Sequence, residues 1–248
     1  MSNYTFLQPS RIQPAVWGAV LWAALLGRKR SPREDGLAVR SGLRPAVSVA
    51  GRENLPASGP YVVVANHLNG PGVWVGVAAA LIAAGIGDRS PDAVIRGVGV
   101  AAYRDFKIGF LPVPDGVTDF LFGRFYEVYG IIRMPRVTEG ASARSGAVRA
   151  ILSALRQGHI VLLFPEGRNV DNFRMRLFQP GVGDLIRLAG KAGAPAIPVA
   201  VAPVDGTFSV TFLPAMVVEP LASRERIEAE MGKIIAAALP VELRGAYG

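Results

Sequence analysis

Two short turns carry the side chains best suited to acid–base chemistry, and each turn follows an apolar run. The first turn, at 66–72 (NHLNGPG), comes directly after YVVVA at 61–65. The second, at 165–169 (PEGRN), comes after HIVLLF at 159–164. His67 is one of only two histidines, and in this turn it is a candidate general base. The plainer alternative is a histidine that only caps or packs.

The second turn presents a carboxylate and a cation. Pro165 removes a backbone donor, and Gly167 permits a tight turn. The side chains of Glu166 and Arg168 are therefore expected to project from a fixed loop. Such a pair could bind a polar anionic substrate, or it could form a solvated ion pair of little energetic weight.

Strand-like and helix-like segments alternate along the chain. Short apolar runs predict strands at 61–65, 159–164, 196–202 and 208–213, the last two joined by a hairpin turn at Asp205-Gly206. Apolar residues at helical spacing predict helices at 144–157, 184–192 and 227–238. The stretch 73–84 is apolar on every side, which predicts a helix that is buried or faces lipid and ends at Gly85 and Gly87. This order predicts an α/β fold: a single domain with a mostly parallel mixed sheet flanked by helices. Ligands of such folds bind beyond the carboxyl ends of strands, where both turns lie.

An apolar stretch at 12–27 stands apart from this pattern. It contains Trp17 and Trp22 and is too short to span a bilayer unaided. The basic cluster that follows it consists of Arg28, Lys29, Arg30 and Arg33. We expect 1–40 to be an amphipathic or interfacial segment on an anionic membrane surface, ahead of an α/β domain at 41–248. A core helix followed by a solvated charge run is the alternative.

The composition narrows the class of protein. The chain has 248 residues, of which half are hydrophobic, and its formal net charge is +8. Such hydrophobicity excludes intrinsic disorder. With no cysteine and two histidines, disulfides, thiolate zinc sites, three-histidine metal sites and thiol nucleophiles are excluded. A basic and apolar chain favours a membrane surface or anionic substrates over nucleic acid. A genome bias towards Ala, Val, Gly and Arg is the plainer explanation.

Four segments in order resemble the motifs of the glycerolipid acyltransferase family, which includes the lysophosphatidate acyltransferases. LPASGPYVVVANH at 55–67 is similar to the lead-in of the first motif, and GIIRMPR at 130–136 to the second. FPEG at 164–167 matches the third, and PAIPVAV at 195–201 matches the fourth. FQPG at 178–181 takes the place of the family's Phe-x-x-Gly.

This resemblance implies transfer of an acyl group from acyl-CoA or acyl carrier protein to the hydroxyl of a phosphate-bearing lysophospholipid or related alcohol. His67 would be the general base, with Glu166 as the second catalytic residue. The implied substrate-binding residues are Asn66, Asn69, Arg136, Gly167, Arg168 and Asn169. No metal and no cofactor beyond the thioester co-substrate is implied. A role in phospholipid biosynthesis goes with this assignment, with the protein cytoplasmic and peripheral on the inner face of the membrane.

The chain departs from the family pattern beside its histidine. The family has an Asp five residues after the His, which holds the imidazole tautomer, and here that residue is Gly72. Asn69 replaces the usual Ser, and Arg168-Asn169 replaces Thr-Arg. Three hypotheses remain: another carboxylate, with Glu166 the nearest candidate, reaches His67; His67 acts alone in slower chemistry; or the fold and lipid-binding surface persist without transfer. Amine acylation or ring closure is a further alternative, because a neutral amine relies less on a strong base.

One further pattern has a different explanation. Residues 96–102 (RGVGVAA) fit the dinucleotide-binding sequence G-x-G-x-x-A. Pro112 and Pro114 follow too soon for the strand–helix–strand unit that such a site needs, so we expect no nucleotide site there.

Overall fold

The computed structural model describes residues 14–68, 75–100, 107–108, 111–112, 114–135, 140–167, 173–204, 207–219 and 221–248. Its helices are α1 (Pro14–Leu26), α2 (Pro32–Gly42), α3 (Val75–Arg89), α4 (Asp115–Tyr129), α5 (Ala141–Arg156), α6 (Val182–Lys191) and α7 (Arg224–Ala237). Its strands are β1 (Ser48–Ala50), β2 (Tyr61–Ala65), β3 (Ile95–Val100), β4 (Lys107–Ile108), β5 (Leu111–Pro112), β6 (Ile132–Met134), β7 (Ile160–Leu163), β8 (Ala196–Val204) and β9 (Thr207–Phe212). Short 3-10 turns are η2 (Arg52–Asn54), η4 (Val241–Leu243) and η5 (Gly245–Tyr247).

A seven-stranded sheet in the order β1-β9-β8-β2-β7-β3-β6 forms the centre of the molecule. Among the described strand pairs of this sheet, β8–β9 is antiparallel and the others are parallel. Val63 in the middle of β2 lies opposite Leu162 of β7 and Ile197 of β8. Every residue of β2 and β7 is buried, which explains why these runs are continuously apolar rather than alternating. The predicted α/β fold with a mostly parallel sheet is confirmed.

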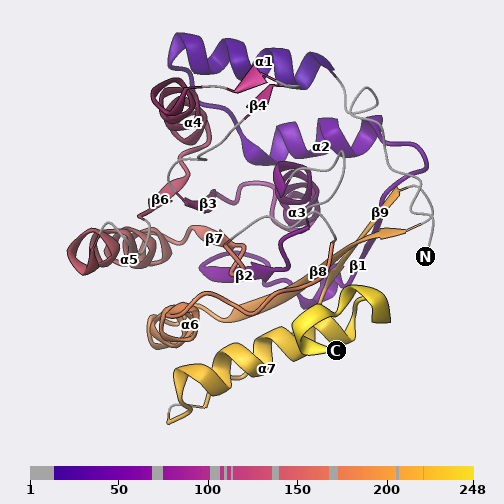
Figure 1. Cartoon of the computed structure of the whole chain (residues 1–248). Helices are drawn as coiled ribbons and strands as arrows, with labels where there is room; N and C mark the ends of the chain where they lie inside the picture. Colours follow the sequence, from indigo (N-terminus) through magenta and orange to yellow (C-terminus); the bar gives the residue numbers. More distant parts are fainter. Residues whose placement is uncertain are drawn as a thin grey trace.

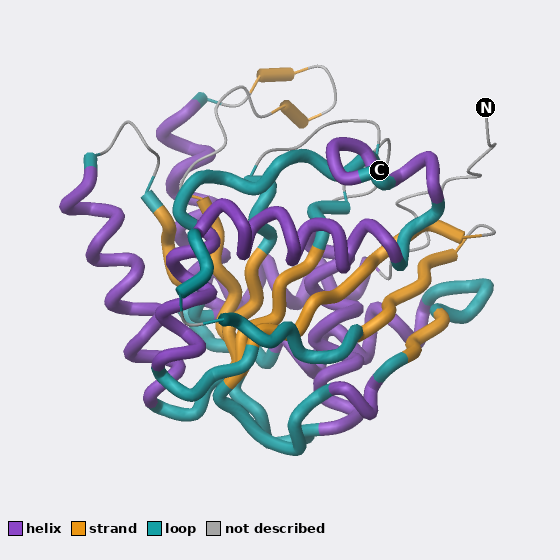
Figure 2. The backbone as a smooth tube through the Cα atoms, turned by 90° about the horizontal axis from the view of Figure 1, so that it is seen from below, coloured by secondary structure: helices purple, strands orange, loops and turns teal. Residues whose placement is uncertain are grey.

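Helices cover both faces of the sheet. Figure 1 shows α2 and α3 on one face and α6 and α7 on the other, with α1 outermost beside α4. Figure 2 shows the strands running side by side between these helices. None of the helices in the described ranges is long and apolar enough to cross a membrane. The boundary expected at residue 40 lies inside α2, and the division of the chain there stays a prediction.

The N-terminal helices are attached to α4 by specific hydrogen bonds. Arg124 of α4 donates from Nε to the carbonyl oxygen of Ala24 in α1, at 3.0 Å. Buried Asp35 of α2 accepts from Nε of Arg30 at 2.8 Å and from the hydroxyl of Tyr129 at 2.7 Å. A buried carboxylate that gains a cation and a hydroxyl donor is a stable junction, and losing either partner would be costly. This junction joins α1, α2 and α4.

Helix α3 runs further than the sequence predicts. The expected end at Gly85 and Gly87 is wrong, because the helix continues to Arg89. A Cβ atom at Gly85 would lie 2.6 Å from the ring of Phe212, and one at Gly87 would lie 2.3 Å from Cγ of Arg33. These glycines allow close packing of α3 against the sheet and against α2. The apolar character of the helix on every side follows from this burial.

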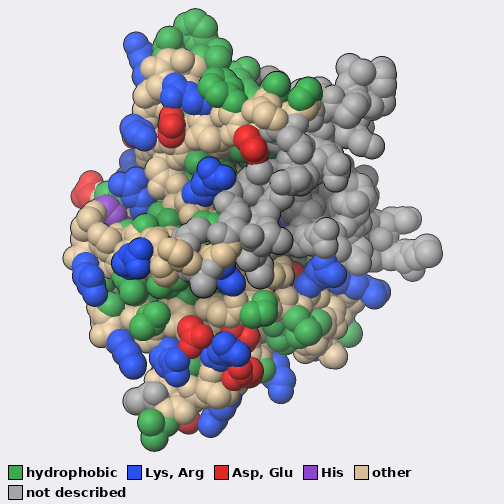
Figure 3. Space-filling model, turned by 60° about the vertical axis from the view of Figure 1, so that its left-hand side comes forward, with side chains coloured by type: hydrophobic (Ala, Val, Ile, Leu, Met, Phe, Trp, Pro, Cys, Tyr) green, Lys and Arg blue, Asp and Glu red, His purple; other side chains and the backbone are tan. Residues whose placement is uncertain are grey.

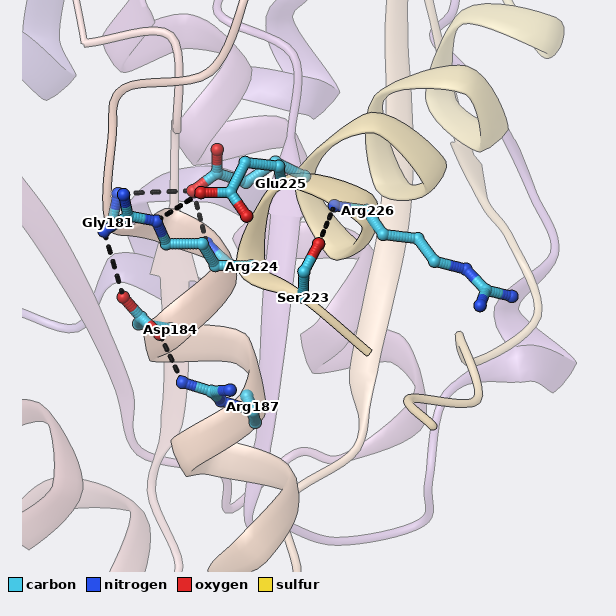
Figure 4. Close-up of polar contacts among 9 residues, drawn as sticks. Gly181, Asp184, Arg187, Ser223, Arg224, Glu225 and Arg226 are labelled. Atoms are coloured by element: carbon cyan, nitrogen blue, oxygen red, sulfur yellow. Dashed lines mark hydrogen bonds and ion pairs between the residues drawn. The ribbon is translucent and has the colours of Figure 1, made fainter. Parts of the chain in front are cut away.

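The contact between α6 and α7 fixes the start of α6. Gly181 and Gly183 donate their backbone N–H groups to Oε1 of Glu228 in α7, at 3.2 and 2.9 Å. A carboxylate at this position satisfies free amides and complements the helix dipole. Ser223 caps α7 itself, because its Oγ accepts from the N–H of Arg226 at 3.2 Å. Figure 4 shows Gly181 and the first turn of α7 in contact.

The remaining elements agree with the sequence except at one motif. The strands β2, β7, β8 and β9 and the helices α5, α6 and α7 lie where they are predicted. Val204 pairs with Thr207, so β8 and β9 form the expected hairpin, although the turn at 205–206 lies outside the described residues. Gly97 and Gly99 lie within β3 rather than at a strand–helix turn. The described part of this pattern, up to Val100, is therefore strand.

Candidate functional site

The turns that carry His67 and Glu166 leave the sheet at the same edge. β2 and β7 are parallel neighbours, and Val64 near the end of β2 lies opposite Leu163 at the end of β7. The residues after each strand therefore emerge side by side. The backbone N–H of His67 donates to Oε1 of Glu166 at 2.6 Å. The two predicted catalytic residues are thus in direct contact.

Glu166 holds three segments of chain together. Its side chain is buried, with 2% exposed. Oε1 accepts from His67, Oε2 accepts from the backbone N–H of Arg176 at 2.7 Å, and its carbonyl oxygen accepts from Nε2 of Gln179 at 3.0 Å. Burial raises the pKa of Glu166 to about 7, against the opposing effect of the two N–H donors and of the Arg176 charge. The carboxyl group therefore titrates near neutral pH while it connects two loops.

The imidazole of His67 is half-buried, and its surroundings make the ring a weak base. Its ring contacts Phe164 edge-on, with centroids 5.8 Å apart and planes at 76°. Burial lowers the pKa of His67 to about 4, so the ring is neutral at pH 7. Nδ1 is buried and has no hydrogen-bond partner within the described part of the chain. A neutral ring can accept a proton, but here it receives little help in doing so.

Glu166 does not replace the missing family carboxylate. The family's Asp contacts the imidazole ring, whereas Glu166 binds the backbone amide of His67. The hypothesis that Glu166 holds the imidazole tautomer is therefore wrong. Its carboxylate fixes the position of the His67 backbone, and the tautomer is left without this support.

Asn66 fixes the other side of the histidine. Its side chain is 1% exposed. Nδ2 donates to the carbonyl oxygen of Val201 at 2.9 Å, and Oδ1 accepts from the N–H of the same residue at 2.8 Å. The amide thus continues the β2–β8 pairing by one more residue. With both polar atoms engaged, Asn66 is arranged to position His67 rather than to bind substrate.

The segment at 173–181 forms a wall beside the second turn. Gln179 donates its backbone N–H to the carbonyl oxygen of Pro165 at 2.8 Å. Gly167 has a positive φ of 65°, and a Cβ atom there would lie 2.8 Å from Cγ of Gln179. Phe178 is buried, and Gly181 starts α6 with φ at 97°. The FQPG segment therefore packs the second turn against the start of α6.

Several predicted site residues lie outside the described residues. These are Asn69, Gly72, Arg136, Arg168 and Asn169. Their roles stay predictions. The backbone of Val201 holds Asn66, and the backbone N–H of Arg176 holds Glu166. Sequence reasoning did not predict these backbone contacts, because no side-chain motif marks them.

Comparison with known proteins finds a family model that matches part of the chain and a solved structure that is similar to most of it. Residues 114–202 match the family model described as Acyltransferase, a range that contains Glu166 and begins after His67. The chain is also similar to the crystal structure of the 1-acyl-sn-glycerophosphate (LPA) acyltransferase PlsC from Thermotoga maritima. The TM-score is 0.53 at 19% identity, covering 88% of this chain and 85% of that chain, which shows a shared fold. None of the curated proteins matches the chain significantly.

Proposed function

We propose that the chain is an acyltransferase of the family whose model matches residues 114–202, and that it moves an acyl group from a thioester to a lipid acceptor. The donor is acyl-CoA or an acylated carrier protein, and the acceptor is the hydroxyl group of a lysophospholipid or related alcohol. One observation carries the proposal: His67 is fixed at the carboxyl edge of the sheet, directly against the buried Glu166.

His67 acts as the general base in this proposal. The acceptor oxygen attacks the thioester carbonyl while the imidazole takes the hydroxyl proton. The carbon–sulfur bond then breaks, and the thiol leaves with that proton, giving an ester and a free thiol. No covalent acyl-enzyme is needed, which suits a chain without cysteine. A positioned general base contributes about 10² to 10⁴ in rate.

The remaining site residues hold the acceptor. We assign Arg136 and Arg168 to its phosphate, because arginine binds phosphate with two parallel hydrogen bonds. Asn69 and Asn169 are assigned to its polar head, and the backbone of Gly167 lines the same turn. Each is carried over from the family resemblance to the matching position of this sequence.

The test is thiol release from acyl-CoA and from acylated carrier protein over a panel of lysophospholipid acceptors. His67→Ala should lose about 10² to 10⁴ in rate. His159→Ala is the matched control, because the other histidine lies before β7, at the opposite end of that strand from Glu166. Equal background rates in the wild type and His67→Ala would contradict the proposal that the protein is an acyltransferase. Lipid or carrier binding that survives His67→Ala without turnover would instead support a silent binding protein.

An amine acceptor is a second candidate, favoured by the unsupported imidazole of His67. Nδ1 has no partner among the described residues, and the pKa of the ring is about 4. A base this weak removes a proton from a neutral alcohol poorly. A neutral amine attacks the thioester first and loses its proton afterwards, so it demands less of the base. Acyl transfer would then give an amide and a free thiol.

A matched pair of acceptors separates the two candidates. One is a lysophospholipid with a free hydroxyl, and the other is the same lipid with an amino group at that carbon. A faster rate with the amine supports the second candidate. Gly72→Asp restores the family's carboxylate and should raise the rate with the hydroxyl acceptor more than the rate with the amine. A faster wild-type rate with the hydroxyl acceptor would exclude the amine as the preferred acceptor.

We also propose that the protein docks on an anionic membrane, at its inner, cytoplasmic face. The supporting feature is an α1/α4 face of exposed apolar side chains: Leu21, Trp22, Leu25, Leu26, Val117, Phe120 and Leu121. Trp22 is 62% exposed and Phe120 is 61% exposed. Figure 3 shows hydrophobic side chains gathered over these helices, with Lys and Arg side chains beside them. Exposed Arg28 and Lys29 follow α1 directly. The side chain of Trp17 lies outside the described residues.

Vesicle sedimentation tests this docking surface. Trp22→Ser with Phe120→Ser should weaken binding to vesicles containing phosphatidylglycerol about tenfold or more, because each aromatic ring gains roughly 1.5–3 kcal/mol on burial. Val217→Ser, another exposed apolar residue, serves as control. Arg28→Gln with Lys29→Gln should weaken binding only to anionic vesicles. Unchanged binding in the aromatic variants would exclude the α1/α4 face.

A further inference from the structure

The last ten residues of the chain fold back onto the wall of the site. Met175 donates its N–H to the carbonyl oxygen of Leu243 at 2.9 Å, and Ala246 donates its N–H to the carbonyl oxygen of Met175 at 3.0 Å. The backbone N–H of Phe178 donates to the hydroxyl of Tyr247 at 3.1 Å. We call 239–248 the C-terminal brace. It provides partners for three backbone groups of the wall.

Tyr247 is itself firmly placed. Its ring meets that of Phe178 edge-on, with centroids 5.4 Å apart and planes at 60°. It also packs on α7, where a Cβ atom at Gly232 would lie 2.2 Å from Cε1 of the Tyr247 ring. Gly245 has φ at 55°, and a Cβ atom there would lie 2.0 Å from the carbonyl oxygen of Met175. Two glycines thus make room for the brace and for its tyrosine.

The wall connects this brace to the catalytic turn. Between Met175 and Phe178, the backbone N–H of Arg176 donates to Oε2 of Glu166. One residue beyond Phe178, Gln179 holds Pro165 and Glu166 through two more hydrogen bonds. The wall begins at Phe173, which is buried with φ at 57°, a conformation that non-glycine residues seldom adopt. Such a segment needs partners on both sides to keep its shape.

Resting on the function proposed above, we propose that Tyr247 is a positioning residue of the acyl-transfer site. It holds the wall at Phe178, so that the amide of Arg176 keeps Glu166 against the amide of His67. The path consists of consecutive contacts: Tyr247 to Phe178, Arg176 to Glu166, and Glu166 to His67. The end of the chain thereby determines the position of the base, about 180 residues earlier in the sequence.

The two hydrogen bonds to the buried Glu166 carboxylate explain why a change at Tyr247 should alter the site. Each oxygen of Glu166 has one backbone N–H donor, and the loss of either leaves a buried acceptor unsatisfied. These donors lower the pKa of Glu166, so a displaced Arg176 amide would raise it further. Burial raises the pKa of Tyr247, and the Glu166 charge adds to this effect. A weakened brace should therefore change how the site responds to pH, which a general loss of stability would not do.

The experiment compares Tyr247→Phe with Tyr247→Ala in the full chain. Tyr247→Phe keeps the ring and removes the acceptor for Phe178. Val241→Ala is the matched control, because Val241 belongs to the brace and is 72% exposed. The first readout is NMR-detected hydrogen exchange of the His67, Arg176 and Phe178 amides in the free protein. The reference is the amide of Val62, which donates to the carbonyl oxygen of Pro195 in the sheet.

Tyr247→Phe should speed exchange at Phe178 and Arg176 about tenfold, the factor set by one typical hydrogen bond. Exchange at His67 should rise in the same direction, with Val62 unchanged. In the acyl-transfer assay, kcat should fall about tenfold with KM for the thioester within about twofold. The pKa of the Glu166 carboxyl group, followed by NMR titration of the free protein, should move upward from about 7. Tyr247→Ala should show each effect more strongly, and Val241→Ala none.

Two results would overturn the proposal. One is unchanged exchange at Arg176 and His67 in Tyr247→Phe, and the other is faster exchange at Val62 by the same factor, which would indicate general destabilisation. If Tyr247→Ala fails to fold, Tyr247→Phe alone decides. If the wild type transfers no acyl group, the proposed function fails, while the exchange measurement still decides whether the brace positions His67.

Discussion

Replacing Glu166 by Gln should remove a pH-dependent loss of folding stability. Burial raises the pKa of this carboxyl group to about 7, from 4.5 in an unfolded chain. The folded protein therefore binds the proton more tightly than the unfolded chain does. Its contribution to stability is fully present below pH 4.5 and declines as the pH rises to 7. With about 1.4 kcal/mol for each pKa unit, the wild type loses about 3 kcal/mol over this range.

His67 contributes a slope of the opposite sign. Burial lowers its pKa to about 4, from 6.5 in an unfolded chain. The folded protein releases this proton more readily, so stability is lost as the pH falls from 6.5 to 4. In the wild type the two effects largely cancel between pH 4.5 and 6.5. Glu166→Gln should expose the His67 slope, and His67→Gln should expose the Glu166 slope.

Urea unfolding at half-unit steps from pH 4 to 8 measures these slopes. The quantity to follow is the free energy of unfolding of the wild type minus that of Glu166→Gln. It should fall by about 3 kcal/mol between pH 4.5 and 8, and any constant offset from the new amide cancels. The double variant should be nearly independent of pH in this range. A difference that does not vary with pH would refute the assignment of a raised pKa to a buried Glu166.

Two further changes test the packing around the site. Asn66→Ala removes both hydrogen bonds to Val201 and should lower the free energy of unfolding by about 2 kcal/mol, measured by urea titration; a change below about 0.5 kcal/mol would contradict the buried pairing. Gly85→Ala should destabilise by about 1–3 kcal/mol because its Cβ meets the ring of Phe212. Gly123→Ala in α4, with open space around it, should stabilise by about 0.5–1 kcal/mol, and equal effects of the two changes would show that packing is not the cause.

The sequence predicts those features of the site that depend on local pattern. The β-branched run at 61–65 and the apolar run at 159–164 each predict a buried strand followed by a polar turn. In a parallel sheet, neighbouring strands deliver such turns to one edge, so the contact of His67 with Glu166 follows once the strands pair. The pairing of β2 with β7 itself is a finding of the structure.

Other features depend on distant contacts and could not be predicted. The sequence predicts a helix end at Gly85, because glycine is typical of helix ends. The close approach of the Phe212 ring, which only the folded chain shows, explains why a glycine lies inside α3. One hypothesis placed the carboxylate of Glu166 beside the imidazole, whereas it binds a backbone N–H group, which every residue except proline has. Tyr247 carries no motif and acts through the backbone of Phe178. Such contacts become visible only in the folded chain.

Acyl transfer by His67 is the central claim, and one assay tests it most directly. Purified protein is given an acyl thioester with a lysophospholipid or its amino counterpart, and thiol release is measured together with formation of the ester or amide. We predict turnover in the wild type and in His159→Ala, and a loss of about 10² to 10⁴ in His67→Ala. Product formation by His67→Ala at the wild-type rate would contradict the claim.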